Sequence, residues 1–393
     1  MKKVKYLMAL TAVLLAMLVL LTGCGGGKWE KETTGEATGV AEAETTAGET
    51  VTDELVTNEP ATSESTTDES VTEVPVASEG LDFTSNGDGT CCVSGIGTCT
   101  DLDVVIPSVS PEGDTVTSIG IIAFAQCTDL TSITIPDSVT SIGNGAFYKC
   151  TSLTSIAIPN SVTSIDKEVF SSCTNLASIE VDSNNSIFYA EGNCLIETAS
   201  NTLIAGCMNS VIPDSVTSIG NWAFNGCTGL TSIIIPDSVT IIGAGAFKAC
   251  IGLTGIVIPD SVTNIGAFAF AGCINLASLE VDGNNSVFHA DGNCIIETAS
   301  NTLIVGCMNS VIPDSVTSID GAAFAECSNL TSITIPGSVT SIASSAFGRC
   351  TALTDITYTG TTDEWNAVSK DSTWDVETPA YTIHCTDGDI VKS

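Results

Sequence analysis

The sequence predicts a β-rich repeat solenoid of about eleven coils with a cap at each end. Three observations carry this prediction. A Phe-x-x-Cys tetrad recurs eight times, its phenylalanines lie 23, 23, 54, 23, 23, 54 and 23 residues apart, and an apolar run ending in Ile-Pro precedes each tetrad. A 23-residue unit inside a 100-residue block is typical of a solenoid, in which each unit buries its apolar side against its neighbours. The tetrads begin at Phe124, Phe147, Phe170, Phe224, Phe247, Phe270, Phe324 and Phe347.

The composition bounds the function. The chain has 393 residues, and its 46 acidic and 11 basic side chains give a formal net charge of -35. Nucleic-acid partners are not expected, because phosphates need Lys and Arg to replace their counterions. A strong acidic excess instead favours solubility and an exposed location.

The N-terminus predicts export. Lys2, Lys3 and Lys5 precede an apolar run that closes at Leu-Thr-Gly-Cys24. This end resembles the lipobox of bacterial lipoproteins, which implies a signal peptide over residues 1–23, diacylglycerol on Cys24 and a lipid-anchored protein on the outer face of the membrane or the cell surface. The alternative is a plain transmembrane anchor, for which the apolar run is short.

Residues 24–80 form a Thr/Glu-rich acidic segment that predicts a disordered stalk. Its apolar side chains are too few to offset chain entropy. As a flexible coil it would reach roughly 40 Å. We therefore expect it to lift the repeats away from the membrane.

One unit, residues 130–153, shows how a coil is built. Its Leu-x-x-Ile-x-Ile opening predicts a strand that Pro136 ends, because proline cannot donate to a ladder. Residues 139–142 predict a second short strand, and residues 146–150 suit one turn of helix. The expected inward positions are Leu130, Ile133, Ile135, Val139, Ile142, Ala146, Phe147 and Cys150.

The phrase Ile-Pro-Asp-Ser-Val-Thr-Ser-Ile-Gly-x-x-Ala-Phe-x-x-Cys-x-x-Leu, at residues 135–153 and 235–253, resembles the BspA-type leucine-rich repeats of bacterial surface proteins. The resemblance covers roughly residues 82–385. It implies a right-handed leucine-rich-repeat superhelix with strands on the concave face. It also implies a surface protein of the adhesion type, whose partner is an extracellular or host protein or glycan.

The period sets the domain boundaries. We expect a cap over residues 81–105, the repeat solenoid over 106–357, and a second cap and tail over 358–393. The coils that begin at Val181 and Val281 have 31 residues. Their extra length predicts hairpin excursions near residues 190–208 and 290–308.

Seventeen cysteines raise the question of disulfides. The tetrad cysteines share one inward site, where Cys behaves as a small hydrophobe, and their spacing does not suit a tetrahedral metal site. A two-residue turn at Ser200-Asn201 would instead place Cys194 opposite Cys207. This predicts possible disulfides at Cys194/Cys207 and, in the next block, Cys294/Cys307.

No catalytic constellation is evident, so we expect neither an enzyme nor a bound cofactor. His289 and His384 are the two histidines, and neither belongs to a nucleophile or carboxylate motif. The Asx-rich runs after Val181 and Val281 suit either turns or calcium ligands.

The outward side chains of the first strand predict a binding face. One outward column contains Val211, Ile234 and Val257, bracketed by Glu180 and Glu280, and Ser232 belongs to the neighbouring column of serines. Contiguous exposed apolar surface often marks a partner site, although β-propensity retained through duplication gives the same pattern. The functional alternative is a structural envelope component without a specific external ligand.

Overall fold

The computed structural model describes residues 76–392, which belong to one compact unit, Thr72–Ser393. The predicted signal peptide, Cys24 and nearly all of the predicted stalk lie outside the described residues. No helix formed by residues 76–392 is both long and apolar enough to cross a membrane.

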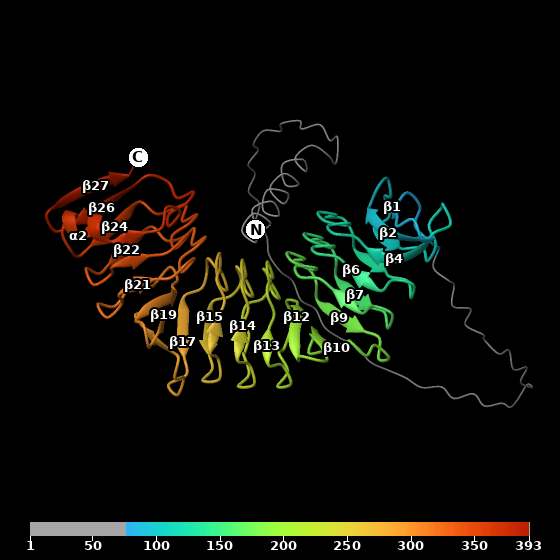
Figure 1. Cartoon of the computed structure of the whole chain (residues 1–393), viewed down its shortest axis with the longest axis horizontal. Helices are drawn as coiled ribbons and strands as arrows, with labels where there is room; N and C mark the ends of the chain where they lie inside the picture. The colour runs from blue at the N-terminus through green and yellow to red at the C-terminus, as the bar shows by residue number, and fades with distance from the viewer. Residues whose placement is uncertain (1–75, 393) are drawn as a thin grey trace, which may run out of the picture. The chain divides into compact units, whose positions relative to one another are not determined.

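The coils contribute short strands to two parallel ladders, and most ordinary coils contribute one strand to each, so the solenoid prediction is confirmed (Figure 1). Ladder A is formed by the strand that ends near the coil's proline. Its members are β3 (Asp103–Val105), β5 (Ser132–Thr134), β7 (Ser155–Ile158), β9 (Ser178–Val181), β15 (Gly255–Ile258), β17 (Ser278–Val281), β22 (Ser332–Ile335) and β24 (Asp355–Tyr358).

Ladder B is formed by the strand that follows the proline turn. Its members are β4 (Thr115–Ile119), β6 (Ser141–Ile142), β8 (Ser164–Ile165), β13 (Ser218–Ile219), β14 (Ile241–Ile242), β16 (Asn264–Ile265), β21 (Ser318–Ile319), β23 (Ser341–Ile342) and β25 (Ser369–Lys370). Within a block, equivalent positions pair, as Ile142 does with Ile165. A residue that points inward in one coil therefore points inward in the next.

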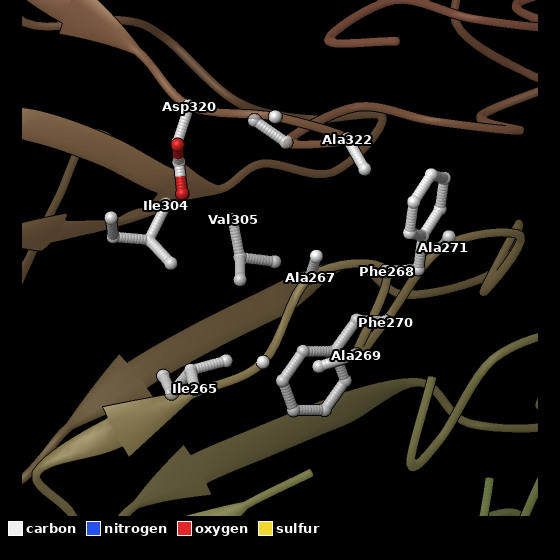
Figure 2. Close-up of a pocket in the computed structure, with 13 residues that line it drawn as sticks. Ile265, Ala267, Phe268, Ala269, Phe270, Ala271, Ile304, Val305, Asp320 and Ala322 are labelled. Carbon is white, nitrogen blue, oxygen red and sulfur yellow. The ribbon is translucent and has the colours of Figure 1, made fainter. Parts of the chain in front are cut away.

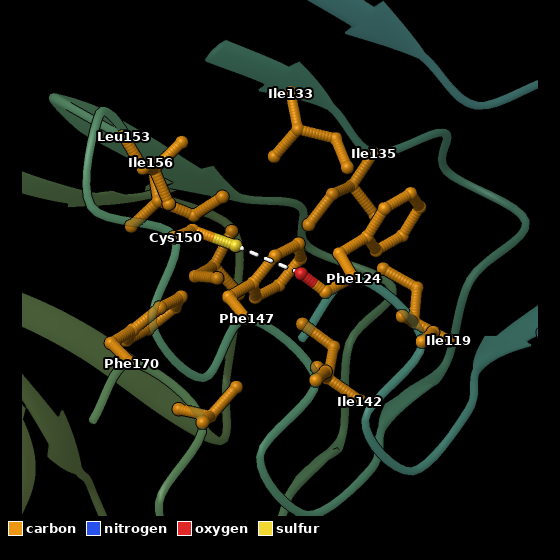
Figure 3. Packing of buried hydrophobic residues seen from close by; sticks show 14 of the residues in the cluster. Ile119, Phe124, Ile133, Ile135, Ile142, Phe147, Cys150, Leu153, Ile156 and Phe170 are labelled. Carbon is orange, nitrogen blue, oxygen red and sulfur yellow. Dashed lines mark hydrogen bonds between the residues drawn. The ribbon is translucent and has the colours of Figure 1, made fainter. Parts of the chain in front are cut away.

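The tetrad phenylalanines form the centre of the core. Phe147 is fully buried, and its ring stacks on Phe124 at 5.6 Å and on Phe170 at 5.7 Å (Figure 3). In the second block, Phe247 lies between Phe224 at 5.1 Å and Phe270 at 5.4 Å. This ladder buries large apolar side chains in contact along the coil axis, which is how a solenoid gains stability from neighbouring units.

The tetrad cysteines are inward, and they also donate hydrogen bonds. The Cys150 thiol donates to the carbonyl of Phe124 in the preceding coil at 3.0 Å (Figure 3). Each such bond gives a buried carbonyl a second partner, because Phe124 O, for example, already accepts from the Cys127 N–H at 3.1 Å. The same bond joins Cys173 to Phe147, Cys250 to Phe224, Cys273 to Phe247 and Cys350 to Phe324.

Burial also makes these thiols unreactive. Desolvation raises the pKa of Cys173, Cys273 and Cys350 to about 12, so they stay protonated at neutral pH. The thiolate is the reactive form of cysteine. The stacked cysteines therefore serve the core.

This burial predicts a labelling pattern. Twelve of the sixteen cysteines among residues 76–392 are buried. We expect an aromatic disulfide reagent at pH 8 to leave these twelve unlabelled in the native, reduced protein and to label them when denaturant is added. Rapid native labelling of the buried set would contradict the packing. Counting thiols in denaturant without reductant also tests the predicted disulfides, since two bonds would remove four thiols from the count.

The segment predicted as a helical turn is a pair of tight turns. Gly145 and Lys149 have φ values of 59° and 60°, which end any right-handed helix. The Phe147 N–H donates to Val169 O of the following coil at 3.0 Å. The helical prediction for residues 146–150 is wrong because Lys149 occupies a left-handed position that usually takes glycine, so the sequence carries little signal for it.

The long coils contain three antiparallel strands each. These are β10 (Phe188–Glu191), β11 (Cys194–Glu197) and β12 (Thr202–Gly206) in one coil, and β18 (Phe288–Asp291), β19 (Cys294–Glu297) and β20 (Thr302–Val305) in the other. β12 pairs in parallel with β13, and β20 pairs in parallel with β21. Leu195, Ile196 and Leu203 are fully buried. In the segments near residues 190–208 and 290–308 the last two strands pair as a hairpin, and because the last strand also joins ladder B, each hairpin completes a coil.

Gly206 replaces phenylalanine in the long coil. Its N–H donates to Ala223 O at 2.8 Å, as the Phe124 N–H donates to Ala146 O in an ordinary coil. The Cys227 thiol donates to Gly206 O at 3.8 Å, the bond that other tetrad cysteines make to a phenylalanine carbonyl. A Cβ on Gly206 would lie 2.0 Å from the Phe224 ring. The 54-residue spacing thus contains two coils, one of which has glycine at the phenylalanine position.

Both ladders are interrupted at the long coils, and ladder A is also interrupted between β5 and β7. Ladder A consists of the separate sheets β3-β5, β7-β9, β15-β17 and one that contains β22-β24. Ladder B consists of three runs, which end at β8, β16 and β25. The interruptions at the long coils lie beside the surface features described below.

The ends of the array differ from its coils. β1 (Asp82–Ser85) and β2 (Thr90–Gly95) form an antiparallel hairpin, and β2 pairs with β4. At the other end, α2 (Thr362–Ala367) begins with a capping box, while β26 (Tyr381–Cys385) and β27 (Gly388–Lys392) extend the sheet of β24. Trp374 contacts the Phe347 ring edge-on at 5.8 Å and closes the phenylalanine ladder.

Candidate binding surface

The outward column on ladder A exposes large apolar side chains in four coils: Val311, 68% exposed, lies beyond Glu280, and the other three are in adjacent coils. Val211, Ile234 and Val257 are 69%, 85% and 53% exposed. Glu180 and Glu280, in the coils on either side, are exposed as well. These three apolar residues, here called the apolar column, therefore lie between two carboxylates.

The backbone under the column changes along its length. Val257 lies in β15, where it pairs with Glu280 of β17. Val211 and Ile234 lie outside the assigned strands, where ladder A is interrupted, and the Val211 N–H donates to Gly192 O at 2.8 Å. The column thus follows the part of ladder A that has the least regular pairing.

The neighbouring serine column is less regular than the alternation of inward and outward side chains along a strand implies. Ser232 is exposed, whereas Ser210 is 8% exposed. The Ser210 hydroxyl accepts from the Cys207 N–H at 2.8 Å and donates to Asn193 O at 2.7 Å. Ser310 makes the same bonds in the next block. Both serines therefore hold the long coil together and do not belong to the surface.

The predicted cysteine pair, Cys194 and Cys207, lies in the long coil, where the pairing of β11 with β12 is shifted from the predicted register. A four-residue loop connects Glu197 to Thr202, and a bulge follows Leu195. Cys194 is therefore opposite Gly206, one residue before Cys207. Both thiols are free and buried in the structure, as are those of Cys294 and Cys307, and the disulfides stay a prediction.

The histidines occupy structural positions. His384 in β26 lies between Asp355 at 3.1 Å and Asp389 at 2.9 Å, and these hydrogen bonds raise its pKa, Asp355 contributing most. His289 contacts the Thr298 hydroxyl at 3.0 Å. Within residues 76–392, no three His, Cys, Asp or Glu side chains are grouped so that they could hold a metal ion.

The Asx-rich runs form turns that join coils. The Asn185 amide donates to Pro159 O at 2.8 Å and to Val162 O at 3.0 Å, and its oxygen accepts from the Ile187 and Phe188 N–H groups. Asn285 makes the equivalent bonds. These bonds occupy the polar atoms of the asparagine, so its role is structural.

Two grooves lie where ladder B is interrupted, and sequence reasoning missed both. The first lies at the interruption between β8 and β12 and has a volume of about 320 Å³. The second lies at the equivalent place between β16 and β20, is shown in Figure 2, and has a volume of only about 20 Å³. The 100-residue duplication could have drawn attention to this region. It aligns Lys167 of the first groove with Ala267 of the second, so one copy carries a charge that the other lacks.

A family comparison covers most of the repeat region. A sequence model of the BspA type Leucine rich repeat region matches residues 106–205, 205–306 and 305–367, in six copies. No match was found among curated proteins.

Solved structures of repeat proteins are also similar to the chain. A leucine rich cell surface protein from Faecalibacterium prausnitzii is 28% identical, with a TM-score of 0.39 over 76% of this chain and 99% of that one. A leucine-rich repeat protein from Eubacterium ventriosum is 24% identical, with a TM-score of 0.44 over 80% and 98%. The pneumococcal vaccine antigen PcpA is 16% identical, with a TM-score of 0.40 over 70% and 67%.

Proposed function

This chain belongs to the BspA type leucine rich repeat family of bacterial surface proteins, and from that premise we propose that it is a lipid-anchored adhesion protein. Its partner is a protein outside the cell, and the contact is made by the apolar column on ladder A. Repeat families of this kind are generally binding scaffolds without enzymatic activity.

The observation that carries the proposal is the exposure of Ile234 at 85% between Val211 and Val257. Burying a Val or Ile side chain stabilises a complex by about 1.5–3 kcal/mol, before the costs of association. Adjacent coils present all three side chains from one ladder, so one flat partner surface can cover them together. An apolar contact of this kind favours a protein partner over a glycan.

The carboxylates bracketing the column restrict the partner's chemistry. Glu180 and Glu280 lie one coil beyond the column at either end, in a chain with a formal net charge of -35. Charge at the rim of an interface mainly sets the association rate and rejects wrong partners. We therefore expect a partner with an apolar centre and a basic rim, and binding that slows as salt is added.

The membrane attachment rests on Cys24 and the Leu-Thr-Gly that precedes it. In the proposal, Cys24 carries the lipid and residues 24–80 connect it to the repeats. We expect Cys24→Ser to abolish incorporation of labelled fatty acid into the chain while the unchanged chain incorporates it. Equal labelling of both would contradict a lipid anchor at Cys24.

A charge placed in the column tests the binding surface. Replacing Ile234 and Val257 with Asp leaves the core intact, because both side chains point to solvent, but it puts two unpaired carboxylates into the contact. We expect adhesion of cells displaying the full chain, to host matrix or to neighbouring bacteria, to fall at least tenfold, since each buried charge opposes binding. Val391→Asp is the matched control, because Val391 is 73% exposed and lies on β27, outside the column.

Unchanged adhesion by a folded Ile234→Asp/Val257→Asp variant would contradict the proposal. That result would favour the structural alternative, an envelope component that has no specific external ligand.

A further inference from the structure

The first groove on ladder B carries an inference beyond adhesion through the apolar column. We propose that the groove between β8 and β12 binds the terminal sugar of an acidic glycan through that sugar's carboxylate. Its volume of about 320 Å³ is at the lower end of the range for ligand sites, about 300–1,000 Å³. One sugar ring fits such a space, whereas an element of a folded protein does not.

The groove combines aliphatic walls with polar groups. Ile165, Ile204 and Ile241 supply apolar surface for the C–H faces of a ring. Lys167 and Asn221 add an ammonium and an amide to the same lining. A few placed polar groups on an apolar wall are typical of small-ligand sites, where they fix orientation.

Asn221 is oriented as a donor. Its side-chain oxygen accepts from the Ala244 N–H at 2.8 Å, which identifies the other atom as the amide nitrogen. Within residues 76–392 that nitrogen has no hydrogen-bond partner. It is therefore free to donate two hydrogen bonds to a ligand.

Two hydroxyls extend this set of polar groups. The Ser200 hydroxyl donates to the Glu197 carboxylate, so the Thr202 hydroxyl, 2.8 Å from it, donates to Ser200 and its oxygen can accept from a ligand. Ser218 lies beside Ile241 in the paired strands β13 and β14, and the described residues give its hydroxyl no side-chain partner. Together the two hydroxyls can accept and donate, which matches the hydroxyls of a sugar.

Lys167 supplies the charge. Four of the other cations among residues 76–392 are bonded: Lys248 to Glu326, Arg349 to Glu377, Lys370 to backbone carbonyls, and Lys392 to Asp375. Lys149 lies over the Tyr148 ring at 5.2 Å. The Lys167 side chain is exposed and its ammonium has no hydrogen bond, ion pair or ring contact within the same residues, whereas its backbone carbonyl accepts from Gly145 and Asn144.

The lining of the groove favours an anion, although Glu168 lies next to Lys167 in the chain and interacts with its charge. None of its ten described lining residues is acidic, although the chain has 46 acidic side chains. An unpaired ammonium in such a lining favours a carboxylate ligand, because a charge-assisted hydrogen bond is roughly twice as strong as a neutral one.

The second groove serves as an internal comparison. It has Ala267 in place of Lys167, Gly321 in place of Asn221 and Asp320 in place of Gly220 (Figure 2). The hydroxyl equivalent to that of Ser218 is also occupied there, because Ser318 and Ser341 bond each other at 2.8 Å. The duplicated groove thus lacks the amine, the amide and the volume, and it adds an acid.

A pair of matched sugars tests the assignment. Methyl β-glucuronide and methyl β-glucoside differ in having a carboxylate or a hydroxymethyl group, and N-acetylneuraminic acid supplies a carboxylate from a different sugar. Binding to the full chain is measured by ligand-detected NMR titration up to tens of millimolar. We expect at least one acidic sugar to bind at least tenfold more tightly than the glucoside, and its binding to weaken with added salt.

Variants taken from the second groove locate the site. Lys167→Ala is expected to weaken binding of the acidic sugar about tenfold or more, and Asn221→Gly to weaken it severalfold. Lys149→Ala, which removes an exposed lysine outside the groove, leaves binding unchanged. Protection of the buried thiols shows that each variant is folded.

Several outcomes would overturn the proposal. These are equal affinity for glucuronide and glucoside together with no preference for N-acetylneuraminic acid, no binding of any sugar, or unchanged binding by folded Lys167→Ala. Tighter binding of N-acetyl-leucine than of either acidic sugar would show that the groove takes a peptide carboxylate instead. Asp substitutions at Ile234 and Val257 leave sugar binding unchanged, so failure here and failure of the adhesion proposal are distinguishable.

Discussion

Gly206→Ala is expected to destabilise the protein by about 3 kcal/mol or more, the upper end of the cost of overpacking a core. A Cβ at this position would lie 2.0 Å from Cε1 of Phe224 and 2.5 Å from its Cζ. The ring cannot move away easily, because it stacks on Phe247 at 5.1 Å on its other side. The Gly206 backbone is also fixed, since its N–H and its carbonyl both bond the next coil.

Urea unfolding followed by circular dichroism measures this change. Gly283→Ala is the matched control, because a Cβ at Gly283 meets no atom within 4 Å. Adding Phe224→Leu to Gly206→Ala should recover part of the lost stability by removing the ring that the methyl group meets. A Gly206→Ala variant as stable as the Gly283→Ala variant would show that Gly206 does not replace phenylalanine in the stack.

Phe247→Ala is expected to lower the free energy of unfolding by about 3–5 kcal/mol, the usual cost of removing a buried phenylalanine ring. Phe247 is fully buried between the rings of Phe224 and Phe270. Its loss leaves a cavity that neither neighbour can fill without breaking its own stack. Because each coil is stabilised through its neighbours, we also expect the transition to broaden.

The control for this variant is Phe268→Ala. Phe268 is in the following coil and is only partly buried, against Ala271, Ala322 and Ala325. Its replacement should cost less than half as much in the same urea experiment. Equal losses for the two variants would contradict the central role of the stacked rings.

The period predicted the core because equivalent positions of successive coils must share one environment. That argument is sufficient to place Phe147 and Cys150 inside and to place Ile234 on the surface. It says nothing of the acceptor that Cys150 finds, since the position of the Phe124 carbonyl depends on how the coils stack. It also misassigned the turn around Lys149, whose left-handed backbone is set by contacts between coils.

The structure of the long coils could not be predicted from the repeat pattern. Thr202 and Leu203 pair with Ser218 and Ile219 of ladder B, but their sequence also suits an isolated hairpin. Gly206 reveals its role only when the Phe224 ring lies beside it. The groove at Lys167 requires the same three-dimensional information, because its walls come from the long coil and from the coils before and after it.

The most direct test of the functional account is the adhesion assay on the Ile234→Asp/Val257→Asp variant, with thiol protection measured on the same preparation. The account predicts that the twelve buried cysteines remain protected while adhesion falls at least tenfold relative to Val391→Asp. Full protection together with unchanged adhesion would contradict it.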